Sequence, residues 1–235
     1  MSDSFEMQVI ARIRSDFGSK FGVPRQSGLV EELEALVVFE PSWRDDNALR
    51  GIEGFSHLWL IWEFSQSPRG SWSPTVRPPR LGGNRRVGVF ASRSPFRPNP
   101  LGLSCVRLLG LEKLPGQGTA LRVGGADLLD GTPIYDIKPY QPLSDSHPDA
   151  RGGFATAVAA HHLTVRFPPE LAARVPAAKL PALTALLAQD PRPAYQTDPE
   201  RVYGFGFAGL EIRFRVQGEE LTVVEVSPWS AQQQP

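Results

Sequence analysis

The stretch His57–Phe64, HLWLIWEF, is nearly continuous in apolar and aromatic residues and sets the expected fold. An apolar run of this length, followed by the polar loop Ser65–Thr75, is typical of a strand buried on both faces in the middle of a sheet. We therefore expect His57–Phe64 to be the central strand of the main sheet, with neighbouring segments adding strands on either side.

Short alternating or apolar segments follow one another on both sides of this strand, separated by turns rich in Gly and Pro. The predicted strands are Phe5–Arg14, Glu34–Glu40, Val87–Phe90, Leu101–Leu111, Thr119–Val123 and Thr132–Ile137. A short helix is expected between Ser42 and Arg50. Strand–helix–strand alternation is missing from this part, which argues against a Rossmann fold. The pattern predicts a mainly β protein, built on a barrel or a sandwich.

The composition turns to Asp, Ser, Pro, His and Gly over Gln141–Gly153, which predicts a domain boundary near residue 150. The later segments predict a strand, two short helices and a hairpin: Thr156–Arg166, helices opening at Pro168 and Pro181, and Glu211–Val216 with Glu220–Val226. We therefore expect a β domain over residues 1–150 and a small α+β domain over 151–235.

The chain has 235 residues with 25 Lys and Arg and 25 Asp and Glu, so its formal net charge is 0. This balance excludes attraction to nucleic acid by overall charge, although a local cationic surface can still bind RNA. Cys105 is the only cysteine and the histidines have no ligand spacing, so we expect neither a disulfide nor a metal site. No apolar run is long enough for a bilayer and a signal sequence is missing, so we expect a soluble cytoplasmic protein.

The segment Arg77–Ser104 is dense in Pro, Gly and Arg and contains no acidic residue. Its arginines are Arg77, Arg80, Arg85, Arg86, Arg93 and Arg97. Guanidinium groups on a backbone stiffened by proline are suited to bidentate binding of carboxylate or phosphate groups. A solvated linker is the plain alternative, but it would not need the apolar Val87–Phe90 within it.

Three polar clusters lie between buried strands: Pro24–Gly28, Arg93–Ser104 and Asp127–Tyr140. Asp136 interrupts an apolar strand, so its carboxylate either forms a structural ion pair or serves a reaction. Asn99 stands between two prolines, and its amide either binds a ligand or caps a local turn.

Known nucleotide-binding and nucleophile motifs are missing or misplaced. The GxGxxG match Gly204–Gly209 lies too near the end of the chain for a following strand–helix–strand unit, so we interpret it as a coincidence. Neither a GxxxxGK[ST] loop nor a GxSxG elbow occurs.

The motif Phe90–Ser104, FASRSPFRPNPLGLS, resembles the signature of the TsaA-like, or TrmO, tRNA methyltransferases. Further segments agree with this family in order along the chain: Pro24–Gln26, Phe55–Trp59, Arg77–Asn84, Asp127–Pro133, Asp136–Tyr140 and Gln189–Tyr195. The resemblance therefore covers nearly the whole chain. It implies a single-sheeted TsaA-like β-barrel, a homodimer with cofactor sites near the subunit interface, and S-adenosylmethionine as cofactor. The implied reaction is N6-methylation of N6-threonylcarbamoyladenosine at position 37 in the anticodon stem-loop of tRNAs that read ACN codons.

The resemblance also assigns site residues. The cofactor should contact Gln26, Ser27, Gly28, Ser65, Gln66, Arg93, Leu103, Ala126, Asp127, Leu128 and Leu129. Ser27 and Ser65 depart from the Pro and His that are common in the family. We expect Asp136 or Asp127 to accept the proton of the acceptor nitrogen. Arg97 or Arg93 should bind the carboxylate of the threonyl group, and Asn99 should donate or accept a hydrogen bond. The expected RNA contacts are Arg77, Arg80, Arg85, Arg86 and Arg192.

Two alternatives remain open. One is a methyltransferase with the same cofactor and a different acceptor, and the other is a non-catalytic RNA-binding barrel that retains the motifs.

Overall fold

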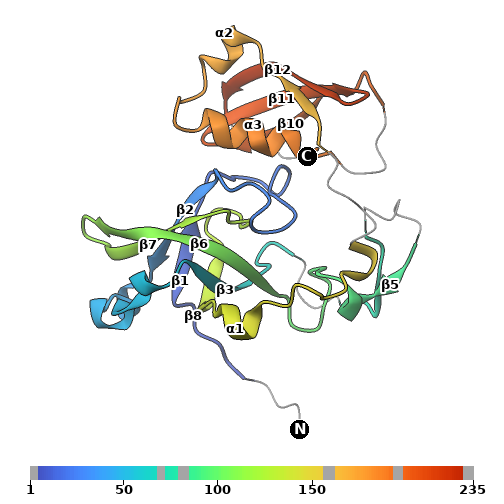
Figure 1. Cartoon of the computed structure of the whole chain (residues 1–235). Coiled ribbons are helices and arrows are strands. Elements are labelled where there is room, and N and C mark those ends of the chain that lie inside the picture. The colour runs from blue at the N-terminus through green and yellow to red at the C-terminus, as the bar shows by residue number, and fades with distance from the viewer. Residues whose placement is uncertain (1–4, 68–71, 79–84, 156–161, 193–197, 230–235) are drawn as a thin grey trace.

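A computed structural model describes residues 5–67, 72–78, 85–155, 162–192 and 198–229. The described chain forms two parts, one built on strands β1–β3 and β6–β8 and the other on strands β9–β12 with helices α2 and α3 (Figure 1). A small two-stranded sheet of β4 (Thr75–Val76) and β5 (Val87–Gly88) lies to one side of the first part.

The first part is a closed barrel in which the strands follow the order β1, β2, β7, β6, β3, β8. Their bounds are β1 Ala11–Arg14, β2 Glu34–Phe39, β3 His57–Glu63, β6 Leu101–Leu114, β7 Gly118–Gly124 and β8 Pro133–Pro139. Strand β8 pairs with β1 as well as with β3, which closes the sheet. The mainly β class is thereby confirmed, and the described residues contain no doubly wound sheet.

Strand β3 differs from its prediction in how it is buried. Leu58, Leu60 and Trp62 are buried inside the barrel at 0, 0 and 8% exposure, whereas the alternate side chains are only half-buried. The outer face is covered in part by helix α1 (Pro142–Asp145), whose Asp145 carboxylate accepts a 2.8 Å hydrogen bond from the Trp59 indole. The unbroken apolar run therefore reflects one core face and one face beneath a short helix, rather than two core faces.

The second part is a four-stranded sheet in the order β10, β11, β12, β9, with two helices. Its elements are β9 Thr164–Arg166, α2 Pro169–Ala172, α3 Leu180–Ala188, β10 Tyr203–Phe207, β11 Leu210–Gln217 and β12 Glu220–Pro228. The predicted hairpin is confirmed as β11 and β12. The GxGxxG match lies on β10 and the turn to β11, so it forms no phosphate-binding loop before a helix.

The second part has its own apolar core, which the first part helps to complete. Phe17, Val30 and Leu33 come from the loop between β1 and β2, yet they are 2–3% exposed and belong to the core that contains Leu183 and Phe205. Two polar contacts reinforce this junction: Lys179 pairs with Asp16 at 2.6 Å, and the Ala208 N–H donates to the Asp16 carbonyl at 2.9 Å. The loop between β1 and β2 is therefore shared by both parts.

Some element bounds depart from the sequence prediction. Strand β1 begins only at Ala11, and 3₁₀ turns over Pro41–Gly54 replace the expected helix. The predicted strand Val87–Phe90 ends at Gly88, because the Val89–Ala91 segment turns back in a 3₁₀ turn that the Ser92 N–H closes onto the Val89 carbonyl. Phe90 is consequently 77% exposed rather than buried. Of the strand expected at Thr156–Arg166, residues 164–166 form β9, and residues 156–161 lie outside the described residues.

Within the described residues, no helix is both long and apolar enough to cross a membrane. Those residues also contain no group of three or more His, Cys, Asp or Glu that could hold a metal ion.

Candidate active site

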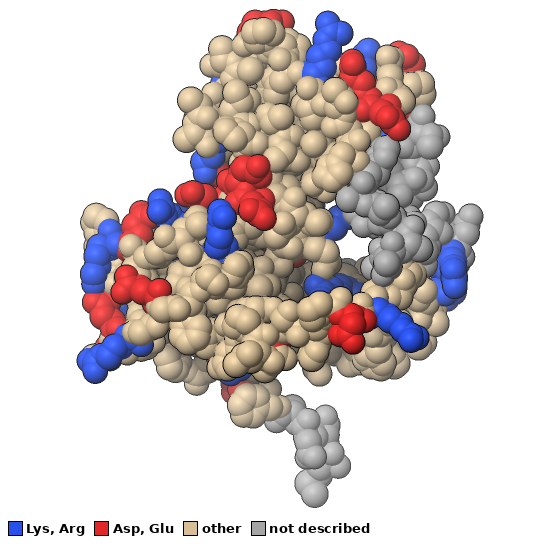
Figure 2. Space-filling view, viewed as in Figure 1, with Lys and Arg blue, Asp and Glu red and all other residues tan. Residues whose placement is uncertain are grey.

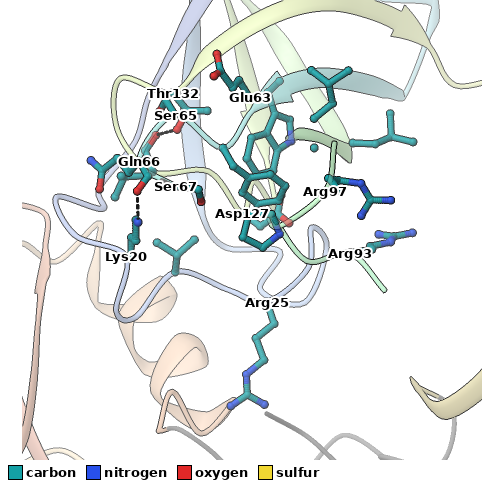
Figure 3. Close-up of a pocket in the computed structure, with 18 of the residues that line it drawn as sticks. Lys20, Arg25, Glu63, Ser65, Gln66, Ser67, Arg93, Arg97, Asp127 and Thr132 are labelled. Carbon is teal, nitrogen blue, oxygen red and sulfur yellow. Dashed lines mark hydrogen bonds between the residues drawn. The ribbon is translucent and has the colours of Figure 1, made fainter. Parts of the chain in front are cut away.

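A pocket of about 560 Å³ lies where the ends of β3 and β6 meet the loops before β2 and after β5. Eight of the predicted site residues line it: Gln26, Ser65, Gln66, Arg93, Arg97, Leu103, Asp127 and Leu129. Ser65, Gln66 and Thr132 lie on one side, Arg93 and Arg97 lie on the other, and Asp127 lies between them (Figure 3). Residues far apart in the sequence are thus gathered around Asp127.

The loop Pro24–Gly28 fills the gap where strands β6 and β7 separate. The Cys105 N–H donates to Ser27 Oγ at 3.2 Å, and the Gly28 N–H donates to the Gly125 carbonyl at 2.9 Å. Gly28 has a φ of 78°, which favours glycine. Ser27 and Gly28 therefore anchor the loop beside the pocket, while Gln26 reaches into it and accepts a hydrogen bond from Arg93.

The pocket has an aromatic wall formed by Trp62 and Phe64, whose ring centroids are 4.4 Å apart in an edge-to-face arrangement. Trp62 on β3 pairs in register with Gly102 on β6. The indole lies directly over this glycine, because a Cβ atom at position 102 would overlap the ring. The missing side chain of Gly102 is therefore what lets the indole lie flat there.

Gly102→Ala is expected to destabilise the fold by about 1–3 kcal/mol, because a buried methyl group forces the indole out of place. Denaturant unfolding of the purified protein measures this. Gly88→Ala is the matched control, since Gly88 has a φ of −59° and its added Cβ would contact nothing within 4 Å. Equal midpoints for the two variants would contradict the expectation.

Asp127 lies at the centre of the pocket and at the end of a hydrogen-bond chain. The Trp62 indole N–H donates to Ser104 Oγ at 2.9 Å, and the Ser104 hydroxyl donates to Asp127 Oδ1 at 2.5 Å. Burial raises the pKa of Asp127 above the usual aspartate value, although the Ser104 hydrogen bond, backbone amides and the nearby Arg93 charge oppose the rise. A carboxyl whose pKa is raised towards neutrality is suited to general acid–base chemistry.

The charged side chains around Asp127 are mostly basic. The pocket is lined by Lys20, Arg25, Arg93 and Arg97, against Glu63 and Asp127. Glu63 accepts a hydrogen bond from the Tyr135 hydroxyl. Arg97 supports the loop itself, since its Nη1 donates to the carbonyls of Ser92 and Ser94 at 3.0 and 3.2 Å. The excess of cations is suited to an anionic group on a ligand.

Arg25 connects this pocket with the second part of the molecule. Its Nη2 donates to the carbonyls of Arg192 and Asp190 at 2.8 and 3.4 Å, and Figure 3 shows the side chain leaving the pocket. The loop after α3 is thus held by a residue that lines the candidate site.

Several predicted site residues lie away from the pocket. Asp136 is half-exposed and pairs with Lys138 at 2.9 Å, which agrees with the ion-pair interpretation, although the pair is not buried. Asn99 is exposed, and its carbonyl accepts the Leu101 N–H in a local turn. The side chains of Ala126 and Leu128 are 3 and 1% exposed because they fill the barrel core.

The predicted RNA-binding arginines have different surroundings. Arg77, Arg85 and Arg86 are exposed, and Arg86 donates to Thr75 Oγ1 at 3.0 Å. Arg80 lies outside the described residues. Arg192 is mostly buried and forms a fork to Asp190 with bonds of 2.8 and 2.9 Å, which raises the pKa of Arg192. Figure 2 shows basic side chains inside the hollow between the two parts of the molecule.

The sequence did not assign Trp62, Lys20 and Arg25, which line the pocket, or Ser104, which lies behind it and bonds Asp127, although Arg25 and Ser104 belong to two of the predicted polar clusters. Ser104 carried a usable signal, because it is a polar residue in phase with the inward-facing Gly102 and Val106 of an apolar strand. Lys20 and Arg25 lie in an irregular loop, where periodicity gives no information.

Comparison with known proteins decides the family. Residues 12–146 match the tRNA-methyltransferase O N-terminal domain, and residues 160–229 match the TrmO C-terminal domain. The chain belongs to the tRNA-methyltransferase O family. The resemblance expected from the sequence motifs is thereby confirmed.

Relatives in the TrmO family match over most of their length. A tRNA (adenine(37)-N6)-methyltransferase of Escherichia coli (strain K12) is 42% identical over 96% of this chain and 99% of that protein. One from Eikenella corrodens is 52% identical over 69% of this chain and 92% of its own. A crystal structure of TrmO from Pseudomonas aeruginosa superposes with a TM-score of 0.79 at 33% identity, covering 97% of this chain and 99% of that one.

Proposed function

We propose that this protein is an S-adenosylmethionine-dependent tRNA methyltransferase that methylates N6 of N6-threonylcarbamoyladenosine at position 37. The observation that carries the proposal is the pocket, in which Asp127 lies between an aromatic wall and basic side chains. The tRNA (adenine(37)-N6)-methyltransferase names of the relatives support the acceptor position. The threonylcarbamoyl group is proposed because its carboxylate suits the guanidinium of Arg93.

The residues present fit S-adenosylmethionine. A volume of about 560 Å³ lies within the usual range of small-ligand pockets. Trp62 and Phe64 offer aromatic rings to a sulfonium cation, and the name of a 40% identical relative in Pseudomonas aeruginosa includes S-adenosylmethionine dependence. We assign contact with the cofactor to Gln26, Ser65, Gln66, Arg93, Leu103, Asp127 and Leu129, with Ser27, Gly28, Ala126 and Leu128 forming the backbone frame behind them. When bound, the cofactor supplies an electrophilic methyl group.

The protein's own residues then position the acceptor and accept its proton. The acceptor nitrogen belongs to a urea-like group and must lose a proton. We assign this proton to Asp127, because Asp127 lines the pocket whereas Asp136 pairs with Lys138 outside it. Arg93 is exposed and lines the pocket, so it is available to the substrate carboxylate, whereas Arg97 holds the loop in shape. Positioning of the reactants by fixed groups of this kind provides much of the rate acceleration of an enzyme-catalysed displacement reaction.

The tRNA would bind across the exposed arginines. Arg77, Arg85 and Arg86 suit the phosphates of an anticodon stem-loop, and we propose tRNAs that read ACN codons as substrates in the cytoplasm. Leu103 and Phe96 line the pocket and remain 49 and 43% exposed, which supports a homodimer with its interface beside the site. A monomer at micromolar concentration in analytical ultracentrifugation would overturn the dimer.

Mass spectrometry of tRNA nucleosides tests the function. In a strain that lacks this gene, restoring the wild-type gene is expected to add one methyl group to N6-threonylcarbamoyladenosine. Restoring the gene with the Asp127→Asn substitution is expected to leave this nucleoside unmethylated. Purified protein should likewise methylate tRNA that carries the threonylcarbamoyl group and not the same transcript without it. Methylation of the bare transcript would replace this acceptor with adenosine itself. Saturable cofactor binding without methylation of any tRNA would reject the proposed function.

A further inference from the structure

We propose that Ser104 is a positioning residue for Asp127: held by the Trp62 indole, its hydroxyl group engages Oδ1 and directs proton exchange with the substrate to Oδ2. This inference rests on the proposed function, in which Asp127 accepts the proton of the acceptor nitrogen. In that step the N–H bond breaks, its electron pair stays on nitrogen, and the new O–H bond forms on Oδ2.

The direction of the hydrogen bonds follows from the chemistry of the donors. An indole N–H can only donate, so Trp62 supplies the hydrogen in its 2.9 Å bond to Ser104 Oγ. The single hydroxyl hydrogen of Ser104 is then directed to Asp127 Oδ1, 2.5 Å away. Ser104 Oγ has a second lone pair, but a proton on Oδ1 would take away the acceptor of the Ser104 hydrogen, which makes no other hydrogen bond among the described residues. Oδ1 is therefore favoured as the acceptor, and the exchangeable proton belongs on the other oxygen.

The Trp62–Ser104–Asp127 hydrogen bonds are held in place by buried packing on the side away from the pocket. Ser104 is 1% exposed and Trp62 is 8% exposed, so bulk water does not compete for their hydrogen bonds. The indole is confined between Gly102 on the paired strand and the ring of Phe64. Ser104 lies two residues beyond Gly102 on β6 and faces the same side of the strand. The two strands thus fix both donors before a substrate arrives.

The alternative is that Ser104 serves only to accept the hydrogen bond of the buried Trp62 indole. The acidic limb of the pH–rate profile distinguishes this structural role from the positioning role. The other charged residues that line the pocket are Lys20, Glu63, Arg93 and Arg97, together with Arg25, whose guanidinium points away to the loop after α3. All of them remain in a Ser104 variant, so a change in this limb reports the lost hydrogen bond. Because the hydroxyl group stabilises the carboxylate, its removal moves the ionisation of Asp127 to higher pH.

The test compares Ser104→Ala, Ser104→Thr and Trp62→Phe with wild type in single-turnover methyl transfer across pH. Ser104→Ala is expected to move the acidic limb up by about one pH unit, because one hydrogen bond to a charged group has that size. Ser104→Thr retains the hydroxyl group and should restore the limb. Trp62→Phe removes the orienting donor and keeps an aromatic ring in the pocket wall, so it should move the limb in the same direction by less.

Thr119→Val is the control, because it deletes a bond from another buried hydroxyl group, Thr119 Oγ1, to a carboxylate outside the pocket, the exposed Asp46. Its acidic limb should stay in place. Carboxyl ¹³C NMR, with Asp127→Asn for assignment, provides a readout that needs no substrate. An unmoved Asp127 titration in Ser104→Ala and Trp62→Phe would overturn the inference. A shifted titration without methylation of any tRNA would leave the positioning role standing and reject the proposed function.

Discussion

Asp127→Asn is expected to lower the rate of methyl transfer by about 10²–10⁴-fold, because removal of a positioned general base has effects of this size. The amide retains nearly the same shape and can still accept the Ser104 hydroxyl, so the pocket should keep its form. Single-turnover methylation at saturating cofactor measures the loss, and cofactor titration checks that binding remains.

The same substitution is expected to leave stability at neutral pH unchanged or higher. Burial raises the pKa of Asp127 in the folded protein above its value in the unfolded chain. Between those two values the folded state holds more protons, so the free energy of unfolding falls as pH rises through this window. The Asp127→Asn variant has no such ionisation. Its free energy of unfolding should therefore exceed that of wild type at pH values above this window, and the difference should vanish below it.

Asp136→Asn is the matched control for catalysis, because Asp136 pairs with Lys138 outside the pocket. It is expected to keep wild-type turnover. If Asp136→Asn loses activity and Asp127→Asn does not, the base has been assigned to the wrong carboxylate.

Phe17→Ala is expected to destabilise the protein by about 3–5 kcal/mol, the usual range for truncating a buried phenylalanine. Phe17 is 2% exposed, and its ring meets the ring of Phe207 edge to face at 5.6 Å. Urea unfolding followed by fluorescence measures the loss, and Phe5→Ala, at a side chain that is 90% exposed, is the control. Similar midpoints for both variants would show that Phe17 contributes little to the shared core.

Strand positions were largely predictable. Burial alternates along β2, the first half of β6 and the apolar run of β3, and these strands carry the barrel's inside–outside pattern. Turns within the arginine-rich segment were not predictable from the pattern. Val89 and Phe90 have the composition of a strand, but the chain turns after Gly88, so one is buried and the other is exposed.

The candidate site was predictable from family motifs and only partly from the residues themselves. Asp136 stood out in the sequence because it interrupts an apolar strand. The carboxylate that lines the pocket beside Ser104 and Arg93 is instead Asp127, which lies in a loop where periodicity gives no information. The partners of Asp127 come from other strands, and only the register of β3 with β6 brings Trp62 and Ser104 together. Such pairing depends on tertiary structure rather than on local sequence.

The shared loop between β1 and β2 affects how the protein can be dissected. A fragment ending near residue 150 would keep Phe17, Val30 and Leu33 but lose the core that covers them, so it would expose an adhesive apolar surface. Arg25 would lose the carbonyl groups that hold it at the same cut. Weak cofactor binding by such a fragment would therefore report damage to the pocket wall, and separating the contributions of the two parts requires point substitutions in the intact chain.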